Sequence, residues 1–428
     1  MVLATHRPRV RNRARGSNRY RCHSSTTCGR GRLLISIDVP VERCAQLPGP
    51  HAPALKKEPA DEGDLGSSDM SSEPVSKYGA VGYHLHRTAR GALRGALRAV
   101  APRFDGSTPG ASGYTPIIGV RHDLLGILES NLMLLAQQDL DNLAETIVVV
   151  DTVPDTLITD RLATMAERYP ELRIRTFFYS PAQRAVAGAI DLPWVYCWLS
   201  WAIGLASAQS DTVVLHDLDA MLLDSGTLER RYATFRAKQL KYFGDRYYSG
   251  HGVTSSDRLV VTWELFIDLA HLRSEHRSID LVNSIGRLGA RRVDFDITLR
   301  AQLETEAREA SEIPRDSFVH PSQVIHQYTQ LRSAKRVYDI PAPWTVFFVP
   351  YFQSLSEGER VLTQACADLR SEDHRPGQSF LGGRVRLRGR PEDNVGWMEE
   401  QVLRLETRMF GRVRPVVQEY LDVLRGLS

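Results

Sequence analysis

The sequence is poor in cysteine and lacks the cysteine patterns that stabilise small secreted domains. Its 428 residues include five cysteines, and no two of them form a Cys-x-x-Cys pair: Cys22, Cys28, Cys44, Cys197 and Cys366. Neither a disulfide framework nor a structural zinc site is indicated, and we expect a reducing, cytoplasmic setting. A basic segment followed by roughly 7 to 15 apolar residues, the pattern of a secretory signal, is also missing.

The common nucleotide-binding motifs are missing as well. No G-x-G-x-x-G follows the first expected strand, and no G-x-x-x-x-G-K-[ST] occurs anywhere in the chain. Dehydrogenases and P-loop nucleotidases need these glycines because their backbone approaches the phosphates closely. Both classes are therefore disfavoured.

Basic residues concentrate near the amino terminus. The chain has 54 Lys+Arg against 51 Asp+Glu, and 18 of the basic and 9 of the acidic residues fall within residues 1–110. Residues 1–69 are rich in arginine and have no apolar periodicity, so we expect them to be disordered. An arm for nucleic acid is the alternative that we disfavour. Because Met70 offers a second start, the sequence leaves open whether residues 1–69 belong to the mature protein.

Residues 70–112 are expected to form a linker with one basic amphipathic helix. Arginines recur there at three- and four-residue spacing, beside an apolar stripe that runs from Leu85 to Val100: Arg87, Arg90, Arg94 and Arg98. Residues 83–100 could dock on an anionic membrane surface or pack on the rest of the protein. The sequence leaves both interpretations open.

Strands alternate with helices over residues 113–345. Short apolar runs predict strands at residues 116–120, 146–150, 174–178 and 212–216, separated by segments with helical spacing. The uncharged residues 192–208 are barely long enough for a membrane span, so we interpret them as a buried helix. This alternation predicts an α/β fold with a mostly parallel sheet. Residues 346–428 are expected to be mainly helical, after an apolar strand at Pro343–Pro350 and with a break near Gly411 and Pro415.

Acidic side chains follow two of the predicted strands. Asp151 ends the second strand, and Asp217-Leu218-Asp219 follows the fourth. Residues i and i+2 of an extended segment point the same way, so Asp217 and Asp219 can face one divalent cation and its diphosphate ligand. Asp139-Leu140-Asp141 has the same spacing, but it lies at a helix exit and is expected to be a solvated turn.

The segments Thr212–Leu223 and Val293–Arg300 resemble the Asp-x-Asp strand and the Glu-Asp-x-Asp-x-x-Leu-Arg pattern of GT-A glycosyltransferases, especially inverting family-2 enzymes. The similarity covers roughly residues 113–330. It implies nucleotide-sugar binding at the first two strand ends and the Asp-x-Asp segment: Val120, Arg121, Asp151 and Asp217. It also implies metal binding by Asp217 and Asp219.

The resemblance implies that Asp294 acts as the general base, with Asp296 as its competitor. A carboxylate on the far side of the reacting carbon would take the proton of the acceptor hydroxyl. Val293 departs from the family pattern, which usually has an acid there. The spacing of Ile297 and Leu299 predicts that a helix begins here, and capping that helix is the alternative role for Asp294.

Many GT-A enzymes have a histidine ligand near the carboxyl end of this domain, so the resemblance makes His320 and His326 candidates for a further metal ligand. His320 is preferred because it follows an expected strand at residues 316–319. Imidazole beside carboxylates favours Mn²⁺ over Mg²⁺. His216 has the opposite parity to Asp217 and Asp219 and is expected to point away from the ion.

Four residues are weaker candidates for the acceptor site. Tyr248 and His251 lie in a segment rich in aromatic residues and glycine, and Trp263 and Glu264 open an expected helix. Aromatic faces suit sugar rings, but an ordinary exposed loop would have the same composition.

The sequence therefore predicts a metal-dependent glycosyltransferase that transfers one sugar from a UDP- or GDP-linked donor to a glycan, lipid-linked or small-molecule acceptor. No nucleic-acid partner is expected, and the oligomeric state is open. One alternative is a sugar-1-phosphate nucleotidyltransferase, although Gly119-Val120-Arg121-His122 lacks the glycine-rich basic loop of that class. The other is a non-catalytic scaffold or lectin-like protein of the same fold.

Overall fold

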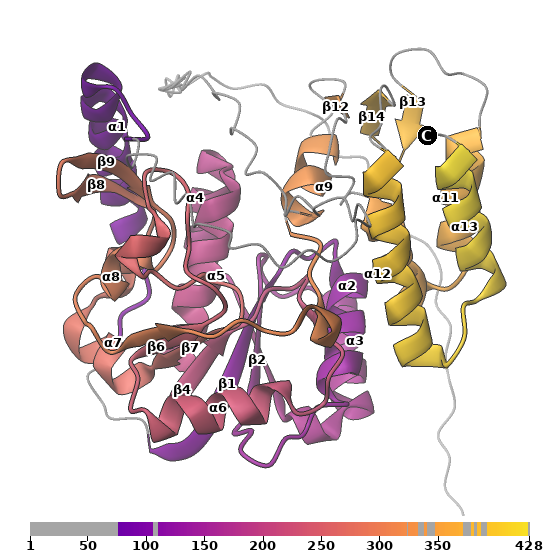
Figure 1. The fold of residues 1–428 in the computed structure, drawn as a ribbon, viewed down its shortest axis with the longest axis horizontal. Helices are drawn as coiled ribbons and strands as arrows, with labels where there is room; N and C mark the ends of the chain where they lie inside the picture. Colours follow the sequence, from indigo (N-terminus) through magenta and orange to yellow (C-terminus); the bar gives the residue numbers. More distant parts are fainter. Residues whose placement is uncertain are drawn as a thin grey trace, which may run out of the picture. The chain divides into compact units, whose positions relative to one another are not determined.

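The computed structural model describes residues 76–105, 110–322, 324–332, 338–339, 347–370, 378–380, 383–386 and 392–426. All of these residues belong to one compact unit, drawn in colour in Figure 1. The prediction for residues 1–69 lies outside these ranges. The boundaries placed at residues 70, 113 and 346 stay predictions.

A seven-stranded sheet forms the centre of this unit, in the order β10-β6-β7-β4-β1-β2-β3. Its strands are β1 (Ala111–Val120), β2 (Thr146–Val150), β3 (Ile174–Phe178), β4 (Ser210–Leu215), β6 (Tyr242–Gly244), β7 (Leu265–Asp268) and β10 (Arg308–Ala310). Strand β1 pairs in parallel with β2 and β4, and only β7 runs antiparallel to its neighbours in this sheet. The predicted α/β fold with a mostly parallel sheet is confirmed.

Helices cover both faces of the sheet (Figure 1). One face packs against α2 (Leu125–Leu135), α3 (Thr156–Arg168) and α6 (Thr227–Ala237), and the other against α4 (Pro181–Ile190), α5 (Pro193–Ser207) and α7 (Leu269–Glu275). In β2, Val148 and Val150 join the first layer, whereas Ile147 and Val149 join the second. Because side chains alternate along a strand, a strand covered on both faces must be apolar throughout.

The uncharged stretch predicted as a buried helix is α5, and most of its residues are buried. Among the described helices, none combines the length and the apolar character that a membrane crossing needs.

The described carboxyl-terminal part is mainly helical, as predicted. Its helices are α10 (Phe348–Glu357), α11 (Arg360–Arg370), α12 (Glu392–Phe410) and α13 (Pro415–Gly426). Helix α10 packs directly on α2, where a Cβ at Gly126 would lie 3.2 Å from the Cα of Gln353. The Ser130 hydroxyl also donates to the carbonyl of Phe352 at 3.3 Å. The backbones of α2 and α10 therefore approach closely.

A buried ion pair joins three of these helices. The carboxylate of Glu406 in α12 is fully buried and lies 2.9 Å from the guanidinium of Arg414, which precedes α13. The Tyr351 hydroxyl of α10 donates to the same carboxylate at 3.1 Å. Such a pair is costly to break because one charge would remain buried alone.

The remaining elements are short apart from α1 (Ala80–Arg98), which is the predicted basic amphipathic helix and packs on the body through Tyr83 and Leu97. A hairpin joins β8 (Ser284–Leu288) and β9 (Arg291–Phe295), and α8 (Leu299–Gln302) follows it. The others are β5 (Met221–Leu222), β11 (Phe318–Val319), α9 (Val324–Arg332), β12 (Tyr338–Asp339), β13 (Gln378–Phe380) and β14 (Gly383–Arg386).

Three local predictions were wrong. Trp263 does not open a helix: Leu265 to Asp268 form β7, since a short apolar run does not distinguish a buried strand from a helix. Asp294 is not at a helix start but inside β9, where it pairs with Ile285. The described end of the segment 343–350 is the start of α10, not a strand, and Pro350 lies in its first turn, where no backbone donor is needed.

Candidate functional site

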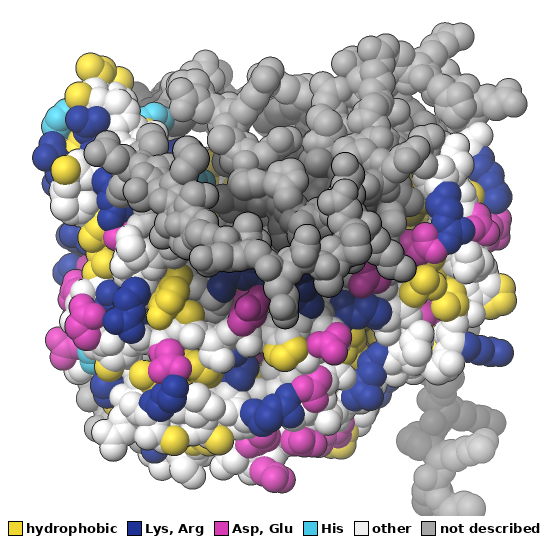
Figure 2. Space-filling model, in the orientation of Figure 1, with side chains coloured by type: hydrophobic (Ala, Val, Ile, Leu, Met, Phe, Trp, Pro, Cys, Tyr) yellow, Lys and Arg dark blue, Asp and Glu magenta, His cyan; other side chains and the backbone are white. Residues whose placement is uncertain are grey.

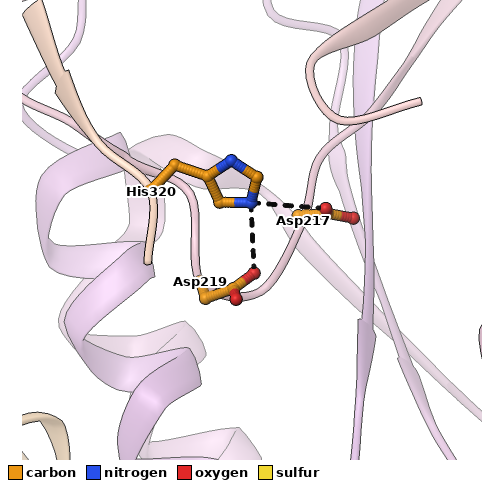
Figure 3. Close-up of side chains that lie close together, drawn as sticks. All are labelled: Asp217, Asp219 and His320. Atoms are coloured by element: carbon orange, nitrogen blue, oxygen red, sulfur yellow. Dashed lines mark ion pairs between the residues drawn. The ribbon is translucent and has the colours of Figure 1, made fainter. Parts of the chain in front are cut away.

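Asp217, Asp219 and His320 converge at the carboxyl end of β4 (Figure 3). The two aspartates come from the loop between β4 and β5, and His320 directly follows β11, which pairs with β5. The Nε2 atom of His320 lies 3.6 Å from a carboxylate oxygen of each aspartate. The short pairing of β5 with β11 thus brings together residues that are about a hundred positions apart in the sequence.

The donor set and spacing suit a divalent cation. Ligand atoms from all three residues lie within 4.8 Å of one another. Ligands about 2.1 Å from a shared octahedral ion stand about 3 Å apart at right angles, so small side-chain movements would complete such a site. Burial disfavours a charged His320, but Asp217 and Asp219 outweigh it and raise the pKa of this imidazole to about 10. This shift reflects strong negative potential at the point where the three side chains meet.

Asn131, a residue that the sequence did not single out, fixes the loop that carries the two aspartates. Its amide nitrogen donates to the carbonyls of Leu218 at 3.0 Å and Ala220 at 2.9 Å, and more distantly to that of Asp217. Its amide oxygen lies 3.0 Å from Nε2 of His216. Asn131 is buried within α2, so this helix determines the position of the loop.

His216 points away from the candidate ligands, as its parity predicts. Its Nδ1 lies 2.6 Å from the carboxylate of Glu264, and both side chains are fully buried. Glu264 has a φ of 51°, a left-handed conformation that is uncommon for glutamate and that tertiary contacts must maintain. The weak acceptor candidate Glu264 therefore lies beneath the metal-binding loop, as part of its support.

The nucleotide candidates lie at the ends of β1 and β2. Val120 is the last residue of β1, and Asp151 directly follows β2. One Asp151 oxygen accepts hydrogen bonds from the backbone of His122 at 2.9 Å and lies 2.8 Å from its ring nitrogen. The hydrogen bond between the His122 ring and Asp151 is the main reason that the pKa of His122 is raised. Arg121 pairs with Asp123 at 2.6 Å, and its guanidinium also faces the Tyr328 ring.

Trp263 lies against the candidate metal ligands. Its ring centroid is 4.6 Å from that of His320 and 4.9 Å from that of Phe318. Trp263 is half-buried, so it packs on one side of the imidazole and keeps a partly exposed face.

Asp294 and Asp296 gather with the other two acceptor candidates. The backbone amide of Asp294 donates to the carbonyl of His251 at 3.1 Å, and the rings of Tyr248 and His251 are 6.5 Å apart. Burial, and then the charges of Asp296 and Asp294, raise the pKa of Tyr248. The hydroxyl of Tyr78, which the sequence did not indicate, donates to Asp294 Oδ2 at 2.7 Å.

The two oxygens of Asp294 differ. Oδ2 is held by Tyr78, whereas Oδ1 is buried and has no hydrogen-bond partner among the described residues. Asp296 is fixed instead by the Asn283 amide at 2.9 Å and the Ile297 backbone amide at 2.8 Å. Burial raises the pKa of Asp296, and Asp294 adds to this effect.

Aspartates from the β4–β5 loop and from the segment after β9 both affect the pKa of one thiol, that of Cys197. Burial raises the pKa of Cys197 in α5, and the charges of Asp217, Asp296 and Asp219 raise it further. The carboxylates of Asp217, Asp219 and Asp296 therefore all influence this one thiol.

The sequence matches no protein-family model and no curated protein sequence. Among solved structures, the chain is similar to "Mannosyltransferase PcManGT from Pyrobaculum calidifontis in complex with GDP-Man and Mn2+", at 14% identity over 67% of this chain and 86% of that one, with a TM-score of 0.33. It is also similar to S. aureus TarS 1-349, at 13% identity over 74% of this chain and 90% of that one, with a TM-score of 0.33.

A third similarity is to the galactosyltransferase LgtC in complex with donor and acceptor sugar analogues. The identity is 14% over 39% of this chain and 62% of that one, and the TM-score is 0.31. This chain therefore matches less than two thirds of LgtC. At these identities and TM-scores, the three similarities do not assign a function to this chain.

Proposed function

We propose that this protein is a metal-dependent glycosyltransferase that transfers a single sugar from a UDP- or GDP-linked donor to a glycan, lipid-linked or small-molecule acceptor. The observation that carries the proposal is the convergence of Asp217, Asp219 and His320 at the carboxyl end of β4, beside β1. Ligands of open α/β sheets bind at the carboxyl ends of the strands, at the point where the strand order reverses. In this sheet that point lies between β1 and β4.

The donor would occupy the ends of β1, β2 and β4. Asp217, Asp219 and His320 would hold the divalent cation, with Mn²⁺ preferred over Mg²⁺ because one ligand is an imidazole. Bound there, the cation would supply positive charge to the leaving diphosphate. Val120, Arg121 and Asp151 would contact the nucleotide, and the pairing of Asp151 with His122 fixes the direction of that carboxylate.

Asp294 would act as the general base, and its unpartnered Oδ1 would receive the proton of the acceptor hydroxyl. The Tyr78 hydroxyl orients the carboxylate through Oδ2. The deprotonated acceptor oxygen would bond to the anomeric carbon on the side opposite the nucleoside diphosphate, whose bond to that carbon breaks, and the configuration at the carbon would invert. Asp296 is the alternative base, since its raised pKa brings its basicity closer to neutral pH.

Acceptor binding would involve the partly exposed faces of Trp263, Tyr248 and His251. We propose a cytoplasmic location with peripheral membrane contact through residues 83–100. The apolar side chain of Leu85 in α1, which is 66% accessible, supports that contact, and Val81, which is 75% accessible, lies just before this range.

Thermal shift with UDP and GDP, in the presence and absence of Mn²⁺, tests the donor site. One of the two nucleotides should stabilise the wild-type protein only when Mn²⁺ is present, by about 2.7 kcal/mol at 100 times its Kd. Asp219→Asn should abolish this shift. The matched control is Asp141→Asn, an exposed aspartate of the second Asp-x-Asp tripeptide. If neither nucleotide stabilises the wild-type protein with Mn²⁺, the proposed function is wrong.

A further inference from the structure

A strongly basic pocket of about 370 Å³ lies between α1 and the hairpin of β8 and β9. Five arginines line it, three from α1, one from β8 and one from α8: Arg87, Arg90, Arg94, Arg287 and Arg300. The pocket also includes Asn283, Ser284 and the ring of Tyr83. Its lining contains no acidic side chain. Lys and Arg side chains are visible along α1 at the left edge of Figure 2.

The arrangement of α1 directs its arginines into this pocket. Tyr83, Arg87, Arg90 and Arg94 follow one another at spacings of three and four residues, so they share one face of the helix. Tyr83 is buried on that face, and the guanidinium groups of Arg87 and Arg287 lie within 6 Å of its ring centroid. The arginine stripe therefore borders the hairpin, and the pocket between them is a cationic site that is open to solvent, since Arg87, Arg287 and Arg300 are exposed.

Most of this charge is not neutralised within the protein. Among the described residues, Arg94 is the one lining arginine with a carboxylate partner, Asp280 at 2.5 Å. Arg90 lies over the Trp194 ring at 4.3 Å, yet its Nη1 atom is buried without a hydrogen-bond acceptor. The Nε of Arg94 is also buried without an acceptor.

A fully buried hydroxyl adds to these donors. Ser284 is 6% exposed, and its Oγ has no hydrogen-bond partner among the described residues. Buried polar groups without partners are costly, so the three unpartnered donors of the lining indicate that a ligand supplies acceptors. The lining also has one unpartnered acceptor, Oδ1 of Asn283. The ligand must offer several oxygens and negative charge, which is the chemistry of a phosphate or diphosphate group.

The pocket adjoins the proposed base. Asn283, which lines it, donates through its side-chain amide to Asp296 at 2.9 Å. Ile285, another lining residue, is the direct partner of Asp294 in the hairpin. An anion held in the pocket would therefore lie on the Asp294–Asp296 side of the site, whereas the candidate metal ligands lie at the end of β4.

We propose that this pocket binds a phosphate or diphosphate group carried by the acceptor. The inference rests on the proposed function and narrows its acceptor to a phosphorylated compound. The group is borne either by a soluble phosphorylated compound or by a lipid at a membrane surface. In both cases the arginines hold the anion and thereby position the acceptor hydroxyl beside Asp294.

Calorimetric titration with inorganic pyrophosphate in EDTA tests the pocket separately from the metal-dependent donor site. The wild-type protein should bind the anion, and its affinity should fall with added salt. Arg287→Gln combined with Arg300→Gln should weaken binding at least about tenfold, because two charge-assisted contacts are removed. Arg98→Gln is the matched control: it lies in α1, is exposed and does not line the pocket. Equal binding by the double variant and the wild type would overturn the assignment.

Vesicle sedimentation distinguishes the two carriers of the phosphate. Vesicles of phosphatidylcholine, with and without phosphatidic acid, are compared for the wild type, the double variant and Arg98→Gln. If the wild type sediments only with vesicles that contain phosphatidic acid, and the double variant does not, the phosphate group is borne by a lipid. If the wild type binds pyrophosphate but does not sediment with these vesicles, the group is borne by a soluble compound. If the wild type binds neither pyrophosphate nor acidic vesicles, the pocket is not a phosphate site.

A transfer assay connects the pocket to the acceptor. Phosphorylated acceptors should show a KM raised about tenfold or more in the double variant, with kcat little changed. If the wild type transfers sugar to uncharged acceptors but not to phosphorylated ones, the proposal is contradicted. The nucleotide-dependent thermal shift with Mn²⁺ is the separate readout: if that shift is absent while pyrophosphate still binds, the proposed function fails and the anion site stands.

Discussion

His216 and Glu264 form a 2.6 Å contact between two fully buried side chains, directly beneath the loop that carries the candidate metal ligands. Through its second ring nitrogen, His216 also contacts Asn131, which holds three carbonyls of that loop. The candidate ligands are therefore positioned by a buried polar network whose members are not themselves in the candidate metal-binding group.

Asn131→Ala should weaken Mn²⁺ binding without removing a ligand. The substitution leaves buried carbonyls without a donor, at a cost of about 1–3 kcal/mol each, and lets the loop move. Loss of such outer support typically lowers metal affinity by about 10–100-fold. Urea denaturation and Mn²⁺ titration would measure the two effects. Asn142→Ala, at an exposed asparagine bonded to Glu229, should change stability less and leave Mn²⁺ affinity unchanged. Equal Mn²⁺ affinity in Asn131→Ala and wild type would exclude this role.

His320→Asp should reverse the preference between the two candidate ions. Replacement of the imidazole by a third carboxylate makes the donor set all-oxygen, which suits Mg²⁺ better. We therefore expect the ratio of Mn²⁺ to Mg²⁺ affinity to fall, as measured by competition titration. His326→Gln, at the histidine that does not join the metal-binding group, should keep the wild-type ratio. An unchanged ratio in His320→Asp would remove His320 from the ligand set.

Asp294→Asn should lower kcat for sugar transfer by about 10²–10⁴-fold, since general-base catalysis contributes a factor of this size. The nucleotide-dependent thermal shift should persist, because Asp294 is not among the candidate metal ligands. Asp296→Asn should have the smaller effect on kcat. The opposite order, with Asp296→Asn the more damaging, would assign the base to Asp296.

The contact between His122 and Asp151 should stabilise the fold more at low pH than at high pH. Its hydrogen bond raises the folded-state pKa of His122 above the ordinary value of about 6.5. The contribution is thus fully present below about pH 6.5 and is lost as the pH rises through the raised pKa. The difference in Tm between wild type and His122→Gln should be larger at pH 6 than at pH 9. A difference that grows with pH would have the wrong sign for this mechanism.

Glu406→Gln should destabilise the protein by about 3–5 kcal/mol, because it leaves the largely buried guanidinium of Arg414 without its counter-charge. Urea denaturation would measure the loss. Glu399→Gln provides the control: its partner Arg425 is nearly half exposed, so this pair should contribute less than about 1 kcal/mol. Similar losses in the two variants would show that burial does not set the strength of the Glu406 pair.

The sheet and the two aspartates of the candidate metal-binding group were predictable from local sequence, whereas His320 was proposed from the resemblance. Residues 147–150 of β2 are all apolar, and the aspartates of the candidate metal-binding group follow β4, whose last residues are apolar too. Parity alone separated His216 from Asp217 and Asp219. Such signals lie within a few neighbouring residues, where the geometry of a strand determines which side chains share a direction.

The supporting residues had no local signal. Asn131 lies 85 residues from His216, and Tyr78 lies 216 residues from Asp294. Glu264 was placed on the wrong element because Leu265 to Asp268 form a strand too short for its period to be recognised. The basic stripe of α1 was visible, but the sequence could not show that it faces a pocket beside β8.

Helix α2 is shared by two parts of the protein with different roles. Asn131 on this helix holds the metal-binding loop, while the adjacent Ser130 and the preceding Gly126 contact α10 of the carboxyl-terminal region. A truncation that removes the carboxyl-terminal helices would leave every proposed ligand and the proposed base in the chain. The truncated protein should nevertheless bind the metal more weakly, because α2, which positions the loop, would no longer pack against α10.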